Sequence, residues 1–304
     1  MLDAGIYEQL SRLVIAMKQK SSQNMAGNCR SVQKGTSAEF SDFREYMPGD
    51  DLRRLDWNVY ARSERMYIRE YFEEKEAVVS VILDTSASMH YGKKSKAELA
   101  QDLCAVIAFL TLHHMDRLVL YDSSQMGTPL VVSGGKNALP KVLGWLQART
   151  FSGTETDSFS AVRQMQRRGA GVTVIVSDFL TEAATDPTQD RLEKTMQYLD
   201  FTKQRPVLLQ TLCAEELRVT MDGTRNLIDM ESKEKLRVTM RADVIARYEQ
   251  ELQKLSVRLK KSASAAGGTY ILCDSEKERR ALILEDLRPV SYTHLRAHET
   301  LANL

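Results

Sequence analysis

Hydrophobic residues along the chain follow two spacings, and these predict its architecture. Continuous apolar runs rich in β-branched residues predict strands buried on both faces, and apolar positions three and four apart predict helices. The strands are predicted over residues 77–83, 117–121, 130–132, 172–176, 207–212 and 269–273, and the helices over 99–110, 139–146, 159–167, 192–199 and 244–259. This alternation predicts an α/β fold, a doubly wound and mostly parallel sheet with helices on both faces.

Three segments depart from that alternation. Residues 5–20 place apolar side chains at helical spacing, which predicts an amphipathic helix that docks on a neighbour. Residues 217–240 hold short strand-like pieces around two turn signals and predict a small hairpin. Residues 290–304 continue no pattern of the domain, and their sequence is typical of a translated adapter, so we expect a non-native tail.

Composition and charge narrow the classes of protein to be considered. With 304 residues, 43% hydrophobic and 27% charged, the chain can bury a full core. The net charge of +1 lacks the basic excess of a nucleic-acid binder. No apolar run approaches the ~20 residues that span a bilayer, and the N-terminus has no signal-peptide pattern. The four separated cysteines indicate buried thiols in a reducing compartment, so we expect a cytoplasmic protein without membrane insertion.

The strongest chemical signal follows the predicted strand 77–83. Asp84, Ser86 and Ser88 alternate along a loop at the carboxyl end of that strand, where ligands bind in parallel α/β sheets. One carboxylate and two hydroxyls offer three hard oxygens, which suit Mg²⁺ or Mn²⁺. Three oxygens underfill an octahedral shell, so other loops, water or an outside carboxylate must complete it.

Two later segments supply further oxygens. Residues 153–157 carry Thr154 and Thr156 before a predicted helix, and Asp178 follows the predicted strand 172–176. An alternative keeps these residues structural: Ser86 and Ser88 would cap the following helix, and Asp178 would end its strand. Because two of the three segments directly follow predicted strands, whose carboxyl ends meet at one edge of a parallel sheet, we favour a metal site.

An enzymatic alternative uses Asp84 as a nucleophile. Phosphatases of the aspartyl-phosphate type also place that residue after a buried strand, but they generally need an acid two residues later. Ser86 stands there and cannot act as a general acid. The sequence also lacks a G-x-S-x-G elbow and a phosphate-binding P-loop. We therefore predict no enzymatic activity and keep a metal-dependent phosphohydrolase as the alternative.

Residues 39–76 are dense in charges and aromatic rings. Trp57, Tyr60 and Phe72 would be costly to expose together, so we expect them to pack within an ion-pair network, with Asp50 or Asp51 capping a short helix. The alternative is a solvated loop with surface ion pairs. The segment contains Arg44-Glu45-Tyr46-Met47-Pro48-Gly49-Asp50-Asp51-Leu52-Arg53-Arg54-Leu55-Asp56-Trp57, followed by Ala61-Arg62.

That motif, followed by the Asp84 loop, resembles domain-of-unknown-function family 58, a bacterial von Willebrand factor A-like family, over most of residues 30–290. The order Asp-x-Ser-x-Ser, Thr, Asp also resembles the metal-ion-dependent adhesion site of von Willebrand factor A domains. The resemblance implies that Asp84, Ser86 and Ser88 are direct or near-direct ligands and that Asp178 binds through water. It implies Thr156 as the threonine, with Thr154 as the alternative.

The resemblance also implies partners and an organisation. Members are commonly encoded beside MoxR-type AAA+ ATPases, which implies a role in assembly or maturation of other proteins, and many carry N-terminal membrane helices that we do not find here. We expect an N-terminal helical and β extension over 1–75 packed on a von Willebrand factor A-like, Rossmann-like domain over 76–289. The expected function is a Mg²⁺- or Mn²⁺-dependent adaptor that binds an acidic side chain of a protein partner.

Overall fold

The computed structural model describes residues 5–11, 40–71, 77–152, 158–165, 170–180, 190–220, 223–230 and 233–287. The chain divides into two compact units. The larger contains Met1–Met17 and Ala77–Ala297, and the smaller contains Lys18–Glu76 and His298–Leu304. Among the described helices, none combines the length and the apolar composition that crossing a bilayer requires.

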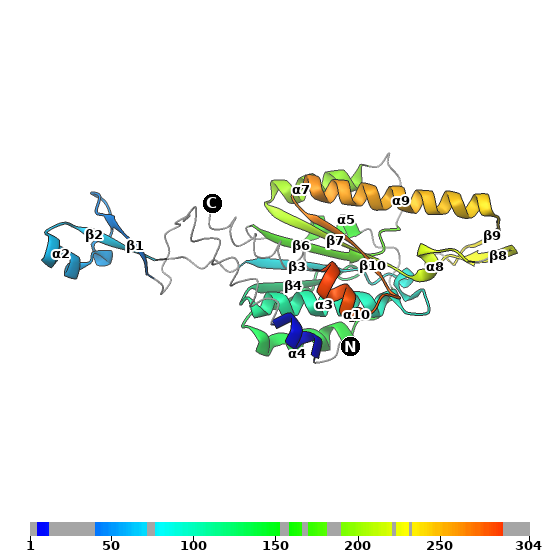
Figure 1. The fold of residues 1–304 in the computed structure, drawn as a ribbon, viewed down its shortest axis with the longest axis horizontal. Helices are drawn as coiled ribbons and strands as arrows, with labels where there is room; N and C mark the ends of the chain where they lie inside the picture. Colours follow the sequence, from blue (N-terminus) through cyan, green and yellow to red (C-terminus); the bar gives the residue numbers. More distant parts are fainter. Residues whose placement is uncertain are drawn as a thin grey trace. The chain divides into compact units, whose positions relative to one another are not determined.

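A six-stranded sheet in the order β10-β7-β6-β3-β4-β5 organises the larger unit (Figure 1). All neighbouring strands pair in parallel except β4 and β5, which pair in antiparallel fashion. The strands are β3 (Val78–Leu83), β4 (Arg117–Asp122), β5 (Leu130–Val132), β6 (Gly171–Ser177), β7 (Gln204–Leu212) and β10 (Thr269–Asp274). The predicted mostly parallel sheet is therefore confirmed, and strands β3 and β6 at its centre are almost entirely buried.

Helices cover both faces of this sheet, as the alternation of strands and helices predicted (Figure 1). Successive side chains of a strand point to opposite faces, so Val81 joins one core and Ile82 the other. The first core includes α3 (Lys96–His113) and α4 (Leu139–Gln147), and the second includes α5 (Ser158–Gln164), α7 (Arg191–Phe201) and α9 (Ala242–Ala265).

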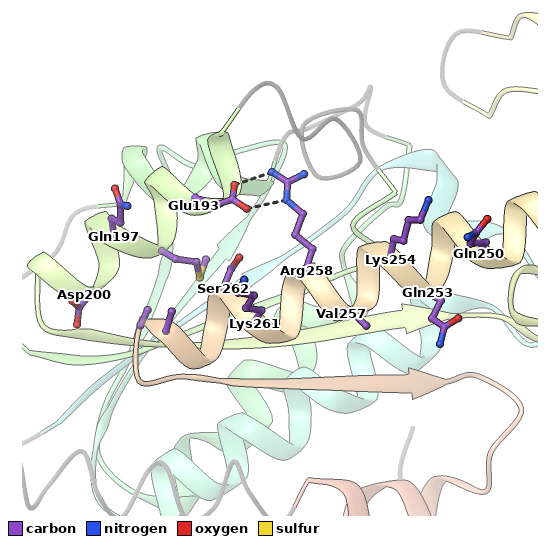
Figure 2. Close-up of a pocket in the computed structure, with 13 residues that line it drawn as sticks. Glu193, Gln197, Asp200, Gln250, Gln253, Lys254, Val257, Arg258, Lys261 and Ser262 are labelled. Atoms are coloured by element: carbon purple, nitrogen blue, oxygen red, sulfur yellow. Dashed lines mark hydrogen bonds and ion pairs between the residues drawn. The ribbon is translucent and has the colours of Figure 1, made fainter.

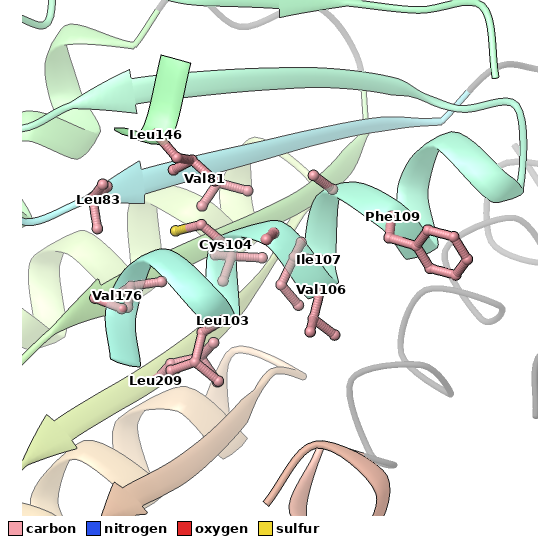
Figure 3. Close-up of a cluster of buried hydrophobic side chains, with 14 of the residues drawn as sticks. Val81, Leu83, Leu103, Cys104, Val106, Ile107, Phe109, Leu146, Val176 and Leu209 are labelled. Atoms are coloured by element: carbon pink, nitrogen blue, oxygen red, sulfur yellow. The ribbon is translucent and has the colours of Figure 1, made fainter. Parts of the chain in front are cut away.

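Most residues of helix α3 are buried in the first core, where the helix packs against the sheet. Leu103 and Cys104 on α3 are fully buried and lie among Val81 and Leu83 of β3 and Val176 of β6 (Figure 3). Burial raises the pKa of the Cys104 thiol, so the group stays protonated and acts as a small apolar side chain. Cys213 and Cys273 are also free and buried, while Cys29 lies outside the described residues.

Helices α7 and α9 border a groove of about 730 Å³ on the other face (Figure 2). Met196, Val257 and Ala266 contribute to its apolar lining. Arg258 of α9 donates to both carboxylate oxygens of Glu193 of α7, at 2.8 Å in each case. This bidentate pair joins the two helices at the rim of the groove.

Two glycines follow the carboxyl end of α9. Gly267 has a φ of +65°, which lets the chain leave the helix in the left-handed conformation. Gly268 lies so close to Pro206 of β7 that an added Cβ would stand 2.1 Å from the Pro206 carbonyl oxygen. The close approach seats β10 directly against β7.

Three shorter parts complete the larger unit. The predicted hairpin is present as β8 (Gly223–Ile228) and β9 (Lys235–Met240), preceded by α8 (Ala214–Leu217). Residues 5–11 are helical and bury Leu10 in the first core, whereas residues 12–20 lie outside the described residues. After β10 come α10 (Arg279–Ala281) and a π-helical turn (Leu282–Asp286). Residues 288–304 are outside the described residues, so the predicted tail stays a prediction.

The smaller unit is built from β1 (Phe40–Glu45), η1 (Leu52–Arg54), α2 (Trp57–Ser63) and β2 (Tyr67–Tyr71), with β1 and β2 antiparallel. Its acidic side chains make contacts within the unit: Asp51 caps η1, Asp56 caps α2, and Asp50 accepts a hydrogen bond from Arg44 at 2.6 Å. The expected packing of Trp57 within an ion-pair network is wrong, because its side chain is 63% exposed and touches Tyr60 edge-on. The acids are used as helix caps and turn contacts instead. Phe72 lies outside the described residues.

Candidate metal centre

Asp84 follows β3 directly and is almost fully buried at the carboxyl end of the sheet. Its backbone N–H donates to the Val176 carbonyl at 2.9 Å, which ties the loop to β6. One carboxylate oxygen accepts the Ser86 N–H at 3.0 Å, and the other accepts the Ser177 hydroxyl at 2.5 Å. The aspartate is therefore held in one orientation by its own loop and by the neighbouring strand β6.

The surroundings of Asp84 raise its pKa. Burial, and then the negative charge of Asp178, raise the pKa of Asp84 to about 6, although hydrogen bonds from Ser177 and Ser86 lower it. The ionised form is thus costly in this position. A divalent cation beside the carboxylate would stabilise that form, as metal ions do for their acidic ligands.

Ser86 and Ser88 bring their hydroxyls together on the same loop. The two Oγ atoms are 3.0 Å apart, close to the spacing of about 3 Å between adjacent oxygens around an octahedral Mg²⁺ at ~2.1 Å. Ser86 stands at the N-cap of η2 (Ala87–His90) but makes no capping bond with its side chain, and Ser95 caps α3. The alternative in which these two hydroxyls cap the following helix is therefore wrong.

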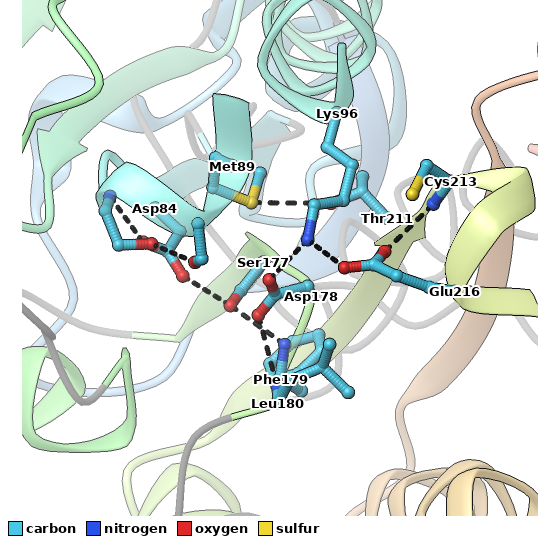
Figure 4. Close-up of polar contacts among 12 residues, drawn as sticks. Asp84, Met89, Lys96, Ser177, Asp178, Phe179, Leu180, Thr211, Cys213 and Glu216 are labelled. Atoms are coloured by element: carbon cyan, nitrogen blue, oxygen red, sulfur yellow. Dashed lines mark hydrogen bonds and ion pairs between the residues drawn. The ribbon is translucent and has the colours of Figure 1, made fainter. Parts of the chain in front are cut away.

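Asp178 lies at the end of β6, the neighbour of β3, and it interacts with Asp84 electrostatically. Its Oδ2 accepts from the ammonium of Lys96 at 2.7 Å, and its Oδ1 accepts the Leu180 N–H at 3.1 Å (Figure 4). Each carboxylate oxygen has two lone pairs, so Asp178 can still accept a water molecule. The water-mediated role implied for Asp178 is compatible with these contacts.

Lys96 is the functional residue that sequence reasoning missed. It is 0% exposed, and its ammonium also donates to Glu216 of α8 at 2.6 Å. Burial alone would lower the pKa of Lys96, but Asp178 and Glu216 raise it above its usual value, so the side chain is charged. Its position at the start of α3 could have indicated an acidic partner. A cation at a helix N-terminus interacts unfavourably with the helix dipole unless a negative group compensates it.

The opposite side of the Asp84 loop is anchored on β4. The Thr85 hydroxyl donates to Asp122 at 2.6 Å, and Asp122 also accepts from the Ser124 hydroxyl at 2.6 Å and from Arg149 at 3.1 Å. Burial raises the pKa of Asp122, but these hydrogen bonds outweigh it and leave the pKa below its usual value. The Arg149 guanidinium lies 4.5 Å from the Trp145 ring centre. The loop between β3 and η2 is thus fastened from both neighbouring strands.

Thr156 and its alternative Thr154 lie at 153–157, outside the described residues, so the threonine of the expected site stays a prediction. Within the described ranges, no group of three or more His, Cys, Asp or Glu side chains is arranged to hold a metal ion. Further oxygens beside Asp84 would have to come from other groups, among them hydroxyls. Ser86 and Ser88 provide them.

Residues 42–258 match the family described as "Protein of unknown function DUF58". The chain belongs to this family. The predicted resemblance to domain-of-unknown-function family 58 is confirmed, and the mostly parallel sheet with helices on both faces is the von Willebrand factor A-like fold expected of a DUF58 protein.

Curated relatives of this DUF58 chain include the uncharacterized proteins Mb1516 of Mycobacterium bovis and Rv1480 of Mycobacterium tuberculosis. Each is 30% identical over 186 residues, which cover 59% of this chain and 58% of the relative. The matched part thus spans less than two thirds of the length of these relatives. Their names state no activity.

Solved structures similar to the DUF58 chain are related in sequence only distantly. An aerotolerance-related membrane protein from Bacteroides fragilis is 11% identical with a TM-score of 0.42, covering 74% of this chain and 99% of its own. BatB from Bacteroides thetaiotaomicron is 12% identical with a TM-score of 0.41, covering 73% and 99%. The SpRpn10 VWA domain is 8% identical with a TM-score of 0.39, covering 69% and 94%.

Proposed function

We propose that this DUF58 protein is a metal-dependent protein-binding module. Asp84, Ser86 and Ser88 would hold Mg²⁺ or Mn²⁺, with further contacts from Asp178 through water and from a threonine, Thr156 or Thr154. The open coordination position would take an Asp or Glu side chain of a partner. The observation that carries the proposal is the pair of hydroxyls 3.0 Å apart beside a buried aspartate whose charge is poorly compensated.

Binding is favoured over hydrolysis by the groups around Asp84. A phosphohydrolase would need a proton donor for the leaving group. Ser86 occupies the usual place of that acid, and Asp178 is engaged in an ion pair with Lys96. The described groups next to Asp84 therefore suit a role as a metal ligand better than a role as the nucleophile of a hydrolase.

The partner class and the location come from the family resemblance. We propose a cytoplasmic adaptor that acts with a MoxR-type AAA+ ATPase in assembly or maturation of other proteins. An ATPase could use such a module to engage substrates, since the metal needs only one exposed carboxylate to form a strong, charge-assisted contact.

Calorimetric titration of the full chain with Mg²⁺ tests the proposal. We expect binding in the micromolar-to-millimolar range in order of magnitude, abolished in Asp84→Ala. Asp243→Ala is a matched control, because Asp243 is exposed on α9 and its loss should leave the titration unchanged. Equal heats from the native chain and Asp84→Ala would contradict the proposal. Beryllofluoride attached to Asp84 would instead support the phosphohydrolase.

A further inference from the structure

Lys96 brings a buried positive charge to the candidate metal centre. Its side chain is fully buried, and its ammonium donates to Oδ2 of Asp178 at 2.7 Å and to Oε1 of Glu216 at 2.6 Å. A site built only to attract a divalent cation would gain nothing from an ammonium on one of its carboxylates, because the two cations repel each other. The lysine therefore indicates a second requirement at this site.

The Asp178 carboxylate is held from two sides (Figure 4). Lys96 contacts Oδ2, and the Leu180 N–H donates to Oδ1 at 3.1 Å. The backbone around it is fixed as well: the Asp178 carbonyl accepts from the Gln210 side chain at 2.9 Å, and Phe179 has a φ of +56° in the left-handed region. Any turn of this carboxylate toward another group would therefore lengthen its contact with Lys96 or with Leu180.

Lys96 is itself held in place by α8. The other oxygen of Glu216, Oε2, accepts the Cys213 N–H at 3.0 Å, and Cys213 is the N-cap residue of α8. Glu216 cannot move with the lysine unless it gives up this contact at the start of the helix. The ammonium thus lies between two carboxylates that backbone N–H groups hold in orientation.

The charges of this cluster decide how a bound ion would be neutralised. Asp84 stands beside the uncharged hydroxyls of Ser86 and Ser88, whereas the charge of Asp178 is compensated by Lys96. With Asp178 held by the lysine, a divalent ion on Asp84 would keep a net positive charge, which favours an outside carboxylate as its next ligand. With Asp178 bound directly, the two aspartates of the chain would neutralise the ion.

We propose that Lys96 is a positioning residue of the metal centre, which keeps the Asp178 carboxylate from coordinating the ion directly and so leaves the charge of the ion, and one coordination position, for an acidic partner. The inference rests on the proposed function and adds to it the residue that regulates the site. Its consequence is a weaker affinity for the metal alone, because one of the two aspartates does not coordinate.

The double variant Lys96→Met/Glu216→Gln releases Asp178 without changing the net charge of the cluster, because it removes one positive and one negative charge. Asp178 then lacks its counter-ion and should coordinate the metal directly. We expect calorimetry on the full chain to show an affinity for Mg²⁺ about tenfold or more above that of the native chain. Lys94→Met/Glu276→Gln is the matched control, because it removes an exposed ion pair in the same way and should leave the affinity unchanged.

Water proton relaxation by bound Mn²⁺ tests the contact itself, because the relaxation rate depends on how many water molecules the ion holds. The ion should hold fewer water molecules in Lys96→Met/Glu216→Gln than in the native chain. In Asp178→Asn, which keeps the Lys96 pair with Glu216, the number should equal the native one. The triple variant Lys96→Met/Asp178→Asn/Glu216→Gln should lose the gain in affinity, because the gain acts through the Asp178 carboxylate. A lysine that only joined α3 to α8 would change none of these quantities.

The unliganded double variant should be less stable than the native chain, because Asp178 keeps a buried charge without its counter-ion. Mg²⁺ should therefore raise its melting temperature more than it raises that of the native chain. If the double variant does not fold, Asp178→Asn decides the matter. A gain of a water molecule on Mn²⁺ in Asp178→Asn would mean that Asp178 already coordinates in the native chain, and the inference would be overturned.

Two further results would overturn the inference and leave the proposed function standing, provided that Asp84→Ala abolishes binding. The first is equal affinity for Mg²⁺ in the native chain and Lys96→Met/Glu216→Gln. The second is a gain in affinity that persists in the triple variant. Binding in the double variant but not in the native chain would support the role of Lys96 and contradict the proposed function. Binding in neither would overturn both.

Discussion

The ammonium of Lys96 lies 2.7 Å from a carboxylate oxygen of Asp178, and both side chains are buried where β6 meets the start of α3. The same ammonium is 2.6 Å from Glu216. The lysine therefore joins the second aspartate of the candidate metal centre to α8, and through α8 to the exposed hairpin. A buried cation with two partners is costly to disrupt, since removing one member leaves uncompensated charge.

Lys96→Met should destabilise the protein by about 3–5 kcal/mol, because Asp178 and Glu216 would keep buried charge without a counter-ion. Urea unfolding measures the difference. Lys94→Met is the matched control: Lys94 forms an exposed pair with Glu276 and should cost no more than about 1 kcal/mol. The triple variant Lys96→Met/Asp178→Asn/Glu216→Gln should recover part of the loss. Equal costs for the two single lysine variants would contradict the buried ion pair.

Two glycine-to-alanine substitutions should have opposite signs. In Gly268→Ala the new Cβ would stand 2.1 Å from the Pro206 carbonyl oxygen, so the backbone must shift and the protein should lose about 1–3 kcal/mol or more. In Gly144→Ala the Cβ meets nothing within 4 Å inside α4, so the helix should gain roughly 0.5–1 kcal/mol. Thermal unfolding distinguishes them. A stable Gly268→Ala protein would show that β10 does not approach β7 this closely.

Leu103→Ala should cost about 2–5 kcal/mol, because the side chain is fully buried between α3 and the sheet and its removal leaves a cavity. Val131→Ala is the control, since Val131 of β5 is 41% exposed and should cost far less. Chemical unfolding of both variants checks the packing of the first core. Similar costs at both positions would indicate that α3 does not pack as described.

Glu193→Gln should remove a pH-dependent contribution to stability. The Arg258 hydrogen bonds lower the pKa of Glu193 below its usual 4.5 in the folded state. A lowered folded pKa stabilises the protein above the unfolded pKa and loses that effect as the pH falls through the folded pKa. The native chain should therefore exceed Glu193→Gln in stability at pH 7, by a small margin because the pair is partly exposed, and the difference should vanish well below pH 4.5. A difference that is constant with pH would contradict this assignment.

The strands and the Asp84 loop could be predicted from the sequence because their signals are local. An apolar, β-branched run ending in Asp84 predicts a buried parallel strand with a ligand at its end, and the structure has β3 there. The ion pairs that Lys96 forms with Asp178 and Glu216 could not be predicted, because they join residues far apart in sequence. Ring density at Trp57 was misleading for another reason: composition does not distinguish packed rings from exposed ones beside capping acids.

Diffraction from crystals of the full chain grown with Mn²⁺ tests the central claim most directly, because anomalous scattering locates the ion. The account predicts a peak about 2.0–2.2 Å from oxygens of Asp84, Ser86 and Ser88, and none at this place in Asp84→Ala crystals. A peak elsewhere with no density at this loop, or an unchanged peak in Asp84→Ala, would contradict it.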